Sequence, residues 1–125
     1  EQASDKKLEA TAWLVLAALH SEERQRRKAK DAADKALELA RAAEDRNAEA
    51  WALHASGMAR WLEGSYAECT AALDLIEEAA DVFGEIGCLR LKGFEMITAA
   101  QMCIQLDRPK PAVAAAKEAL LALRK

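Results

Sequence analysis

Side chains able to do chemistry are few in this chain and lie far apart in the sequence. Neither His20 nor His54 has a carboxylate or cysteine at the spacing of a zinc site such as His-x-x-x-His. Glu77 and Glu78 are adjacent, but neighbours on a helix point about 100° apart and do not work as an acid–base pair. Glycine-rich phosphate loops and Gly-x-Ser-x-Gly elbows are absent. We therefore expect no enzymatic activity, no metal and no cofactor.

The three cysteines form no Cys-x-x-Cys pair, and an odd number is untypical of a disulfide framework. This usage indicates a reducing compartment, so a cytoplasmic location is expected. Cys69 and Cys103 fall on apolar helix faces, where thiols are usually inert small hydrophobes. Cys88 falls in a linker and is the thiol expected to react.

One local cluster of charge could bind a phosphate or an acidic partner. Its members are Arg24, Arg26, Arg27, Lys28 and Lys30. Acidic residues flank the cluster on both sides, which favours a solvated helix face instead. The whole chain has 18 basic and 21 acidic side chains and a net charge of −3. Nucleic-acid binding is therefore not expected, and no apolar run approaches the ~18 residues of a membrane span.

The composition favours helices over strands. Of the 125 residues 52% are hydrophobic, but 30 residues are alanine and only six are aromatic. Ala, Leu, Glu, Lys, Arg and Gln outnumber β-branched residues, Gly and Pro, which favours helix and disfavours sheet. We expect an all-α domain whose thin core is built from closely packed helices.

Apolar residues at three- and four-residue steps predict six helices. The first covers residues 5–20 with Ser4 or Asp5 as N-cap, and a second begins at a Ser21 cap. Because the turn between them has no Gly or Pro, one long helix over residues 5–44 is the alternative. Further N-caps are expected at Asn47, at Ser65 in a capping box with Glu68, and at Asp107 before Pro109.

An internal repeat relates the three expected hairpins. Aligning Ala17 with Gly57 and Ala100 gives offsets of 40 and 43 residues. Four positions earlier, the same offsets align three large residues, Trp13, Leu53 and Met96. Twelve positions later, they align three small residues, Ala29, Cys69 and Ala112. Small residues where helices cross let their axes approach to about 8 Å. Hairpins of this kind bury their apolar faces only by stacking on one another, which predicts an α-solenoid.

These residues resemble the tetratricopeptide repeat family. The pattern is carried by Trp13-x-x-Leu16-Ala17 with Ala29 and Ala36, by Gly57 with Gly64-x-Tyr66, and by Ala112 with Ala119. The resemblance covers about residues 5–124, and the unit length is closer to a long variant than to the standard 34 residues. It implies one domain over residues 1–125, with repeats at about 5–45, 46–86 and 87–125, wound as a right-handed superhelix. We expect this domain to be a segment of a longer protein.

The resemblance also implies a concave groove that binds a protein or peptide. Its expected lining comes from the first helix of each hairpin: Thr11, Leu14, Ala18 and Ser21, then Trp51, His54, Met58 and Trp61, then Phe94, Ile97, Gln101 and Ile104. Exposed aromatic and Met side chains in a concavity are typical binding hot spots. A carboxylate clamp is not expected, because Leu14, Ala18, Ala55, Phe94 and Thr98 occupy the positions where that branch of the family has Lys, Arg and Asn.

Three alternatives stay open at this point. Trp51, Trp61 and Phe94 could instead fill the core between helices, as Trp13 is expected to do. The last helix carries Val113, Leu120, Leu121 and Leu123 without a polar outer face, which would suit a scaffold that self-associates or packs on further repeats. The chain could also be a regulatory segment of a larger enzyme. A non-catalytic module that captures a hydrophobic peptide or helix is the preferred reading.

Overall fold

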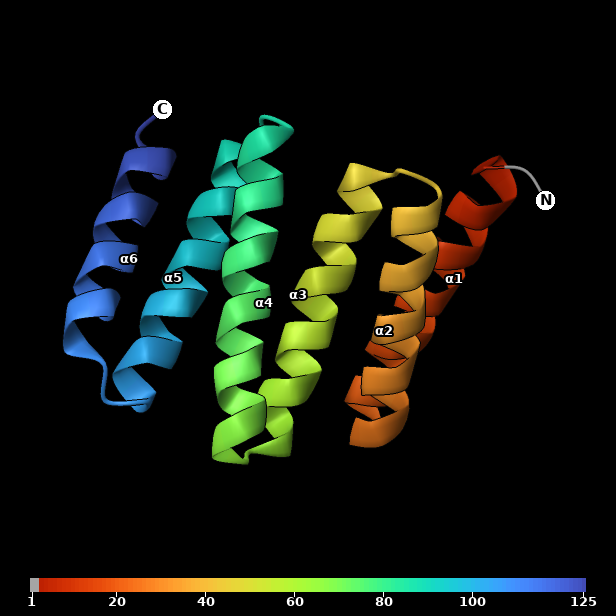
Figure 1. Ribbon diagram of the computed structural model, residues 1–125, viewed down its shortest axis with the longest axis horizontal. Coiled ribbons are helices and arrows are strands. Elements are labelled where there is room, and N and C mark those ends of the chain that lie inside the picture. Colours follow the sequence, from red (N-terminus) through yellow and green to blue (C-terminus); the bar gives the residue numbers. More distant parts are fainter. Residues whose placement is uncertain (1–2) are drawn as a thin grey trace.

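A computed structural model describes residues 3–125 of the chain, and the side chains from residue 5 onward. The described residues form six α-helices and no strand, which confirms the all-α prediction (Figure 1). The helices are α1 (Ala3–Glu22), α2 (Arg26–Ala42), α3 (Arg46–Glu63), α4 (Tyr66–Glu85), α5 (Leu89–Gln105) and α6 (Pro109–Leu123). None of these helices combines the length and the apolar character needed to cross a membrane.

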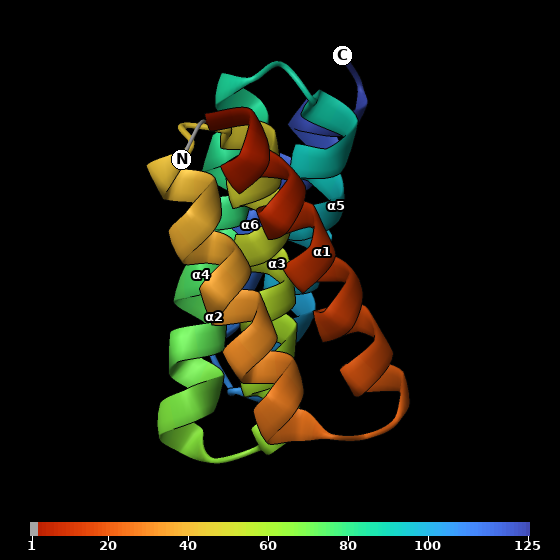
Figure 2. The same cartoon turned by 90° about the vertical axis from the view of Figure 1, so that its right-hand side faces the viewer.

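The helices form three antiparallel hairpins that stand side by side along the long axis, from α1 and α2 to α5 and α6 (Figure 1). Each helix packs mainly on the helices before and after it in the sequence, and α1 also contacts α3. Viewed along the stack, α2 and α4 lie on one side and α1 and α5 on the other (Figure 2). The packing is that of a helical repeat, and residues 5–44 form a hairpin, so the single long helix is wrong.

Four of the five turns use the same backbone device at the helix end. In each, one residue has a positive φ, at Arg24, Glu44, Gly87 and Asp107, and the next amide donates back to the preceding helix. In the first turn, for example, the Gln25 N–H donates to the His20 carbonyl at 2.8 Å. This bond satisfies a helix-end carbonyl without needing a glycine. It explains how α1 can end where the sequence has no Gly or Pro.

Several predicted N-caps were wrong because the helices start earlier or end later than expected. Ser4 and Asp5 lie inside α1, as does Ser21, while Asn47 lies inside α3. The cap of α3 is Asp45, whose carboxylate accepts from the Ala48 amide at 3.2 Å. The side chain moves the helix start two residues before Asn47, since a carboxylate at this position satisfies a free amide of the first turn.

The caps of the later helices also differ in detail. Ser65 caps α4 as predicted, its hydroxyl accepting from the Glu68 amide, but Glu68 does not reach back. The Glu63 carboxylate accepts from the Ser65 hydroxyl at 2.8 Å instead. Asp107 is the positive-φ residue of its turn rather than a cap, although Pro109 occupies the first turn of α6 as expected.

The core is built on the small residues that define the repeat. Ala17, Gly57 and Ala100 are all buried, as are Leu53 and Met96. A Cβ atom at Gly57 would lie 3.0 Å from Ile76 Cδ1, so α3 and α4 approach too closely there for a larger residue. The repeat register read from the sequence therefore marks the places where helices cross.

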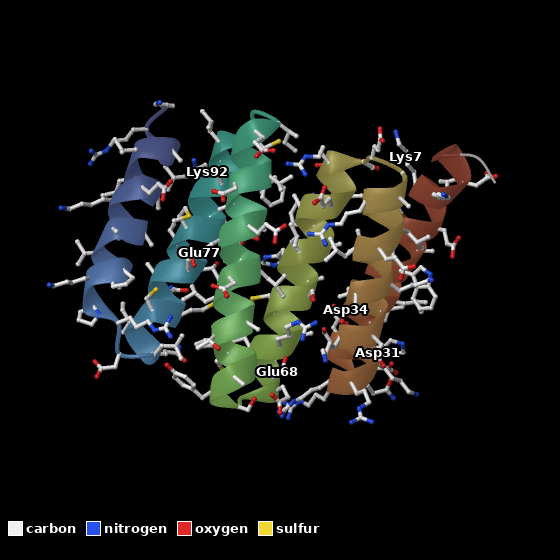
Figure 3. The ribbon with its side chains drawn as sticks, in the orientation of Figure 1. Lys7, Asp31, Asp34, Glu68, Glu77 and Lys92 are labelled. Carbon is white, nitrogen blue, oxygen red and sulfur yellow. The ribbon has the colours of Figure 1, made fainter. Side chains whose placement is uncertain are left out.

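Ion pairs tie α3 to its neighbours on the side opposite α1. Arg60 of α3 lies between Asp34 of α2 and Glu68 of α4, at 3.1 and 3.2 Å (Figure 3). The Ser56 hydroxyl also donates to Asp34, at 2.6 Å. Near the other end of α3, Arg41 of α2 pairs with Glu49 at 3.2 Å. These contacts fix the rotation of α3, which decides which of its side chains face α1.

Glu77 of α4 lies close to Asp74 and Asp81 of the same helix, and its side chain points toward α5 and α6 (Figure 3). Partial desolvation raises the pKa of the Glu77 carboxyl, and Asp74, Asp81 and Glu118 raise it further against the opposing effect of Arg108. The folded protein therefore holds this proton more tightly than the unfolded chain. Its contribution to stability is present at acidic pH and is lost as pH rises through the raised pKa.

We expect Glu77→Gln to be more stable than wild type at neutral pH, because the variant lacks the repelled charge. The gain should be below about 1 kcal/mol, since water screens this exposed site. Thermal melts of both proteins across the acidic to neutral range check this. The difference should vanish where Glu77 of the wild type is protonated, and a difference that does not change with pH would contradict the electrostatic cause.

Candidate functional site

A cavity of about 460 Å³ lies between the first helices of the first two hairpins, α1 and α3. It contains seven of the predicted groove residues together with three that were not predicted. The lining residues are Thr11, Leu14, Val15, Ala17, Ala18, Ser21, Trp51, His54, Ala55 and Met58. We call this space the groove cavity. Most of its surface is apolar, with hydroxyls and one imidazole as the polar groups.

Trp51 is held in place by a buried aromatic residue of the core. Its ring meets Phe83 edge to face, with centroids 5.3 Å apart and an interplanar angle of 77°. Phe83 is fully buried in α4, whereas Trp51 is 39% exposed. Edge-to-face contacts of this kind restrict a ring while leaving the rest of it accessible. Trp51 thus presents a fixed aromatic surface to the groove cavity.

His54 is oriented by a carboxylate that the sequence did not single out. Its Nδ1 lies 2.6 Å from Glu95 Oε1 of α5, and its ring also meets Trp51 edge to face at 6.1 Å. Glu95 is only 1% exposed, and among the described residues its second oxygen, Oε2, has no hydrogen-bond partner. Glu95 corresponds in the repeat to the buried Ala52, so a charge at an inward register position was the signal that could have revealed it.

Two predicted aromatic residues lie outside the groove cavity. Trp61 packs against the core cluster formed by α4, α5 and α6, which is the alternative role considered for it. Phe94 is 56% exposed on α5, and its ring centroid lies 6.5 Å from that of His54. Phe94 therefore extends the apolar surface beyond Trp51 and His54 without lining the cavity itself.

The three remaining predicted positions lie in a different place. Ile97, Gln101 and Ile104 line a hollow of about 310 Å³ whose other wall is α6. That wall consists of Ala116, Ala119, Leu120 and Leu123, with Ala100 at the base on α5. We call this space the edge hollow. The predicted lining residues thus divide between the groove cavity, the edge hollow, the exposed surface that carries Phe94 and the core cluster that contacts Trp61.

The basic cluster beside the second helix faces acidic groups. Arg26, Arg27 and Lys30 line a polar depression together with Asp31, Glu63 and Glu68. Mixed charge of this kind agrees with the solvated face that was favoured over a phosphate site. His20 is not among the residues that line the groove cavity, and its Nδ1 lies 2.8 Å from Gln25 Oε1.

We expect alkylation of the native protein to modify Cys88 first. Cys69 and Cys103 are buried, and Cys88 is half-buried at the start of α5. Burial raises the pKa of the Cys103 thiol, and the nearby Glu77 charge raises it further, so its reactive thiolate is scarce. Mass spectrometry after brief treatment with iodoacetamide should find one modified site, and three after denaturation. Modification of Cys103 at the same rate as Cys88 would contradict this expectation.

The described part of the chain holds no cluster of three or more His, Cys, Asp or Glu side chains arranged to bind a metal ion. The groove cavity offers a shaped, mostly apolar space with a few polar groups, which is typical of a binding site. Comparison with known proteins finds no matching family model and no matching curated sequence.

Proposed function

We propose that this chain is a tetratricopeptide-like interaction module, without catalytic activity, whose groove cavity binds an apolar peptide or helix of a partner protein. The observation that carries the proposal is the convergence of Leu14, Trp51, His54 and Met58 on one cavity between α1 and α3. These residues come from two repeats, and the tetratricopeptide resemblance placed them together in the expected groove. A solenoid presents the first helices of successive hairpins along one surface, which suits a peptide that lies across them.

The chemistry of the lining favours apolar side chains of the partner. Leu14, Trp51 and Met58 supply hydrophobic contacts, and a rigid aromatic residue beside a flexible Met is a common hot-spot arrangement. A volume of about 460 Å³ falls within the ~300–1,000 Å³ typical of binding pockets and suits one or two large side chains. The imidazole of His54 and the hydroxyls of Thr11 and Ser21 can bond the backbone of the partner.

Recognition of a free carboxylate is not supported by this lining. Ala18 and Ala55 stand in the cavity at positions where a carboxylate clamp needs cationic or amide side chains. No Lys or Arg is among the residues that line the cavity. We therefore propose an internal hydrophobic segment as the ligand, held by burial of apolar surface.

The test is a peptide-display selection with wild type and Ala18→Arg run side by side. Ala18 is exposed on α1 and lines the cavity, so a long charged side chain fills the space without entering the core. Ala114→Arg is the matched control, since Ala114 is exposed on α6 and lines none of the cavities described above. Wild type and Ala114→Arg should enrich the same hydrophobic motif, and Ala18→Arg should lose it.

Two further readouts keep the test decisive. All three proteins should have the same helicity and melting temperature, so a loss of binding reports on the cavity. A peptide carrying the motif should protect Trp51 from acrylamide quenching, because this side chain is partly exposed in the free protein. Equal enrichment by Ala18→Arg, or no enrichment by wild type, would rule out the groove cavity as the binding site.

A further inference from the structure

The two ends of the hairpin stack expose faces that correspond to buried contacts inside it. In α3, Ala48 packs with Ala10 and Ala40 of the first hairpin, and Ala55 packs near Ala17 and Ala33. Subtracting the repeat offset of 40 residues from these positions of α3 gives the equivalent positions of α1. We call this the leading face, and it consists of Leu8, Val15, Leu16 and Leu19.

The leading face of α1 is apolar and open to solvent. Its four residues are between 39% and 71% exposed. Their counterparts in α3 are Ala48, Ala55, Ser56 and Ala59, of which three are buried and Ala55 is half-buried against the preceding hairpin. In α5 the counterpart of Leu19 is Met102, which is buried in the core cluster shared with α4. The exposed apolar surface of α1 therefore occupies the positions that α3 uses to pack on the preceding hairpin.

The opposite end of the stack shows the complementary surface. Leu37 of α2 packs against the cluster that holds Ala50 and Leu53 of the next hairpin, and Ala40 of α2 packs with Ala48. The offsets of 40 and 43 residues place the same positions at the exposed Glu77 and the buried Ala80 of α4, and at Leu120 and Leu123 of α6. These two leucines are 49% and 45% exposed, and both line the edge hollow. We call this surface of α6 and the edge hollow the trailing face.

An ion pair between hairpins is also reproduced at the two ends. Arg41 of α2 pairs with Glu49 of α3 at 3.2 Å. Arg41 corresponds to Arg124 of the third hairpin, directly after α6, and Glu49 corresponds to Glu9 of α1. If a second copy packed on α6 as the second hairpin packs on the first, its Glu9 would lie beside Arg124 of the first copy. Asp34 and Arg60, which form another ion pair between those hairpins, correspond to Lys117 and His20 and are not reproduced.

We propose that the trailing face of this chain binds the leading face of a second copy, so that the protein assembles head to tail. The internal contacts between hairpins supply the geometry, the exposed leucines supply the apolar surface, and Glu9 and Arg124 supply the matching charges. Because the two faces differ, each contact leaves a free face at both ends of the assembly. Growth beyond a dimer follows as concentration rises.

The test measures mass against concentration by light scattering and sedimentation. Leu123→Glu blocks the trailing face, because Leu123 corresponds to Ala40 and Ala80, which are both buried. Leu19→Glu blocks the leading face without touching the lining of the groove cavity. Leu121→Glu is the control, since Leu121 is 63% exposed. It corresponds to Glu38 of the first hairpin and Glu78 of the second, which are both exposed. Wild type and the control should pass from monomer to dimer and larger species, and each blocked variant should stay monomeric.

Mixing the two blocked variants gives the decisive result. Leu123→Glu retains its leading face and Leu19→Glu its trailing face, so an equimolar mixture should form a 1:1 complex that grows no further. Exchanging the charges by Glu9→Arg or Arg124→Glu should weaken assembly, and combining both changes in one chain should restore it. A wild type that stays monomeric at its highest soluble concentration, or a symmetric dimer that only Leu123→Glu abolishes, would overturn the proposal. None of these results depends on the groove cavity.

Discussion

Phe83→Ala is expected to lower the free energy of unfolding by about 3–5 kcal/mol, the typical range for removing a buried phenylalanine. Phe83 is fully buried and belongs to a core cluster with Leu53, Ala79 and Val82. Its ring also supports Trp51 through the edge-to-face contact at 5.3 Å. The substitution should therefore weaken the core and also leave Trp51, which lines the groove cavity, without its aromatic support. Urea denaturation followed by circular dichroism measures the first effect.

The chain provides a matched control for this prediction. Phe94 is the only other phenylalanine, and it is exposed on α5 rather than buried. Phe94→Ala removes the same side chain but should change stability by no more than about 0.5 kcal/mol, as surface substitutions usually do. Tryptophan quenching should rise in Phe83→Ala and stay unchanged in Phe94→Ala. Equal destabilisation by the two variants would mean that the burial assigned to Phe83 is wrong.

His54→Ala is expected to lower the free energy of unfolding by about 1–3 kcal/mol, because it leaves the buried Glu95 carboxylate without a partner. One oxygen of Glu95 already lacks a hydrogen bond among the described residues, so removing His54 leaves both oxygens unsatisfied. Desolvation of a charge without compensating bonds is the physical cause of the loss. The variant should also lose the polar group that the groove cavity has beside Trp51.

A double-mutant cycle separates this cause from simple loss of packing. In Glu95→Leu the buried carboxylate is replaced by an apolar side chain, a change that is often neutral or stabilising for a buried charge. Adding His54→Ala to Glu95→Leu should then lower stability much less than His54→Ala does alone. The difference between the two is the coupling energy of the pair. A coupling energy near zero would show that the 2.6 Å contact does not contribute to folding.

Much of the fold could be predicted because a solenoid is nearly one-dimensional. Each hairpin contacts only its neighbours, so residues that repeat at a fixed offset meet equivalent surroundings. This is why aligning Ala17, Gly57 and Ala100 located the helix crossings. It is also why the predicted residues Leu14, Trp51, His54 and Met58 converge on one cavity.

Helix boundaries were predicted less well, because local side-chain preferences compete with backbone hydrogen bonds. Ser21 and Asp107 are good capping residues, yet the first lies inside α1 and the second is the positive-φ residue of a turn. In these turns an amide donates back to a helix carbonyl, as from Arg108 to Cys103 at 2.8 Å. In three of the four turns the positive-φ residue is not glycine, so the usual sequence signal of this helix end is missing.

The sequence alone determined the helical class and the register of the repeats, since both follow from periodicity and small residues along the chain. It left open whether residues 5–44 form a hairpin or one long helix, and the structure shows a hairpin. Only the tertiary structure decided how the groove positions divide. Trp61 packs against the core, and Ile97, Gln101 and Ile104 line the edge hollow because none of the six described helices packs on α6 as α3 packs on α2. The pairing of His54 with Glu95 likewise depends on how closely α3 and α5 approach, which side-chain volumes across two hairpins set together.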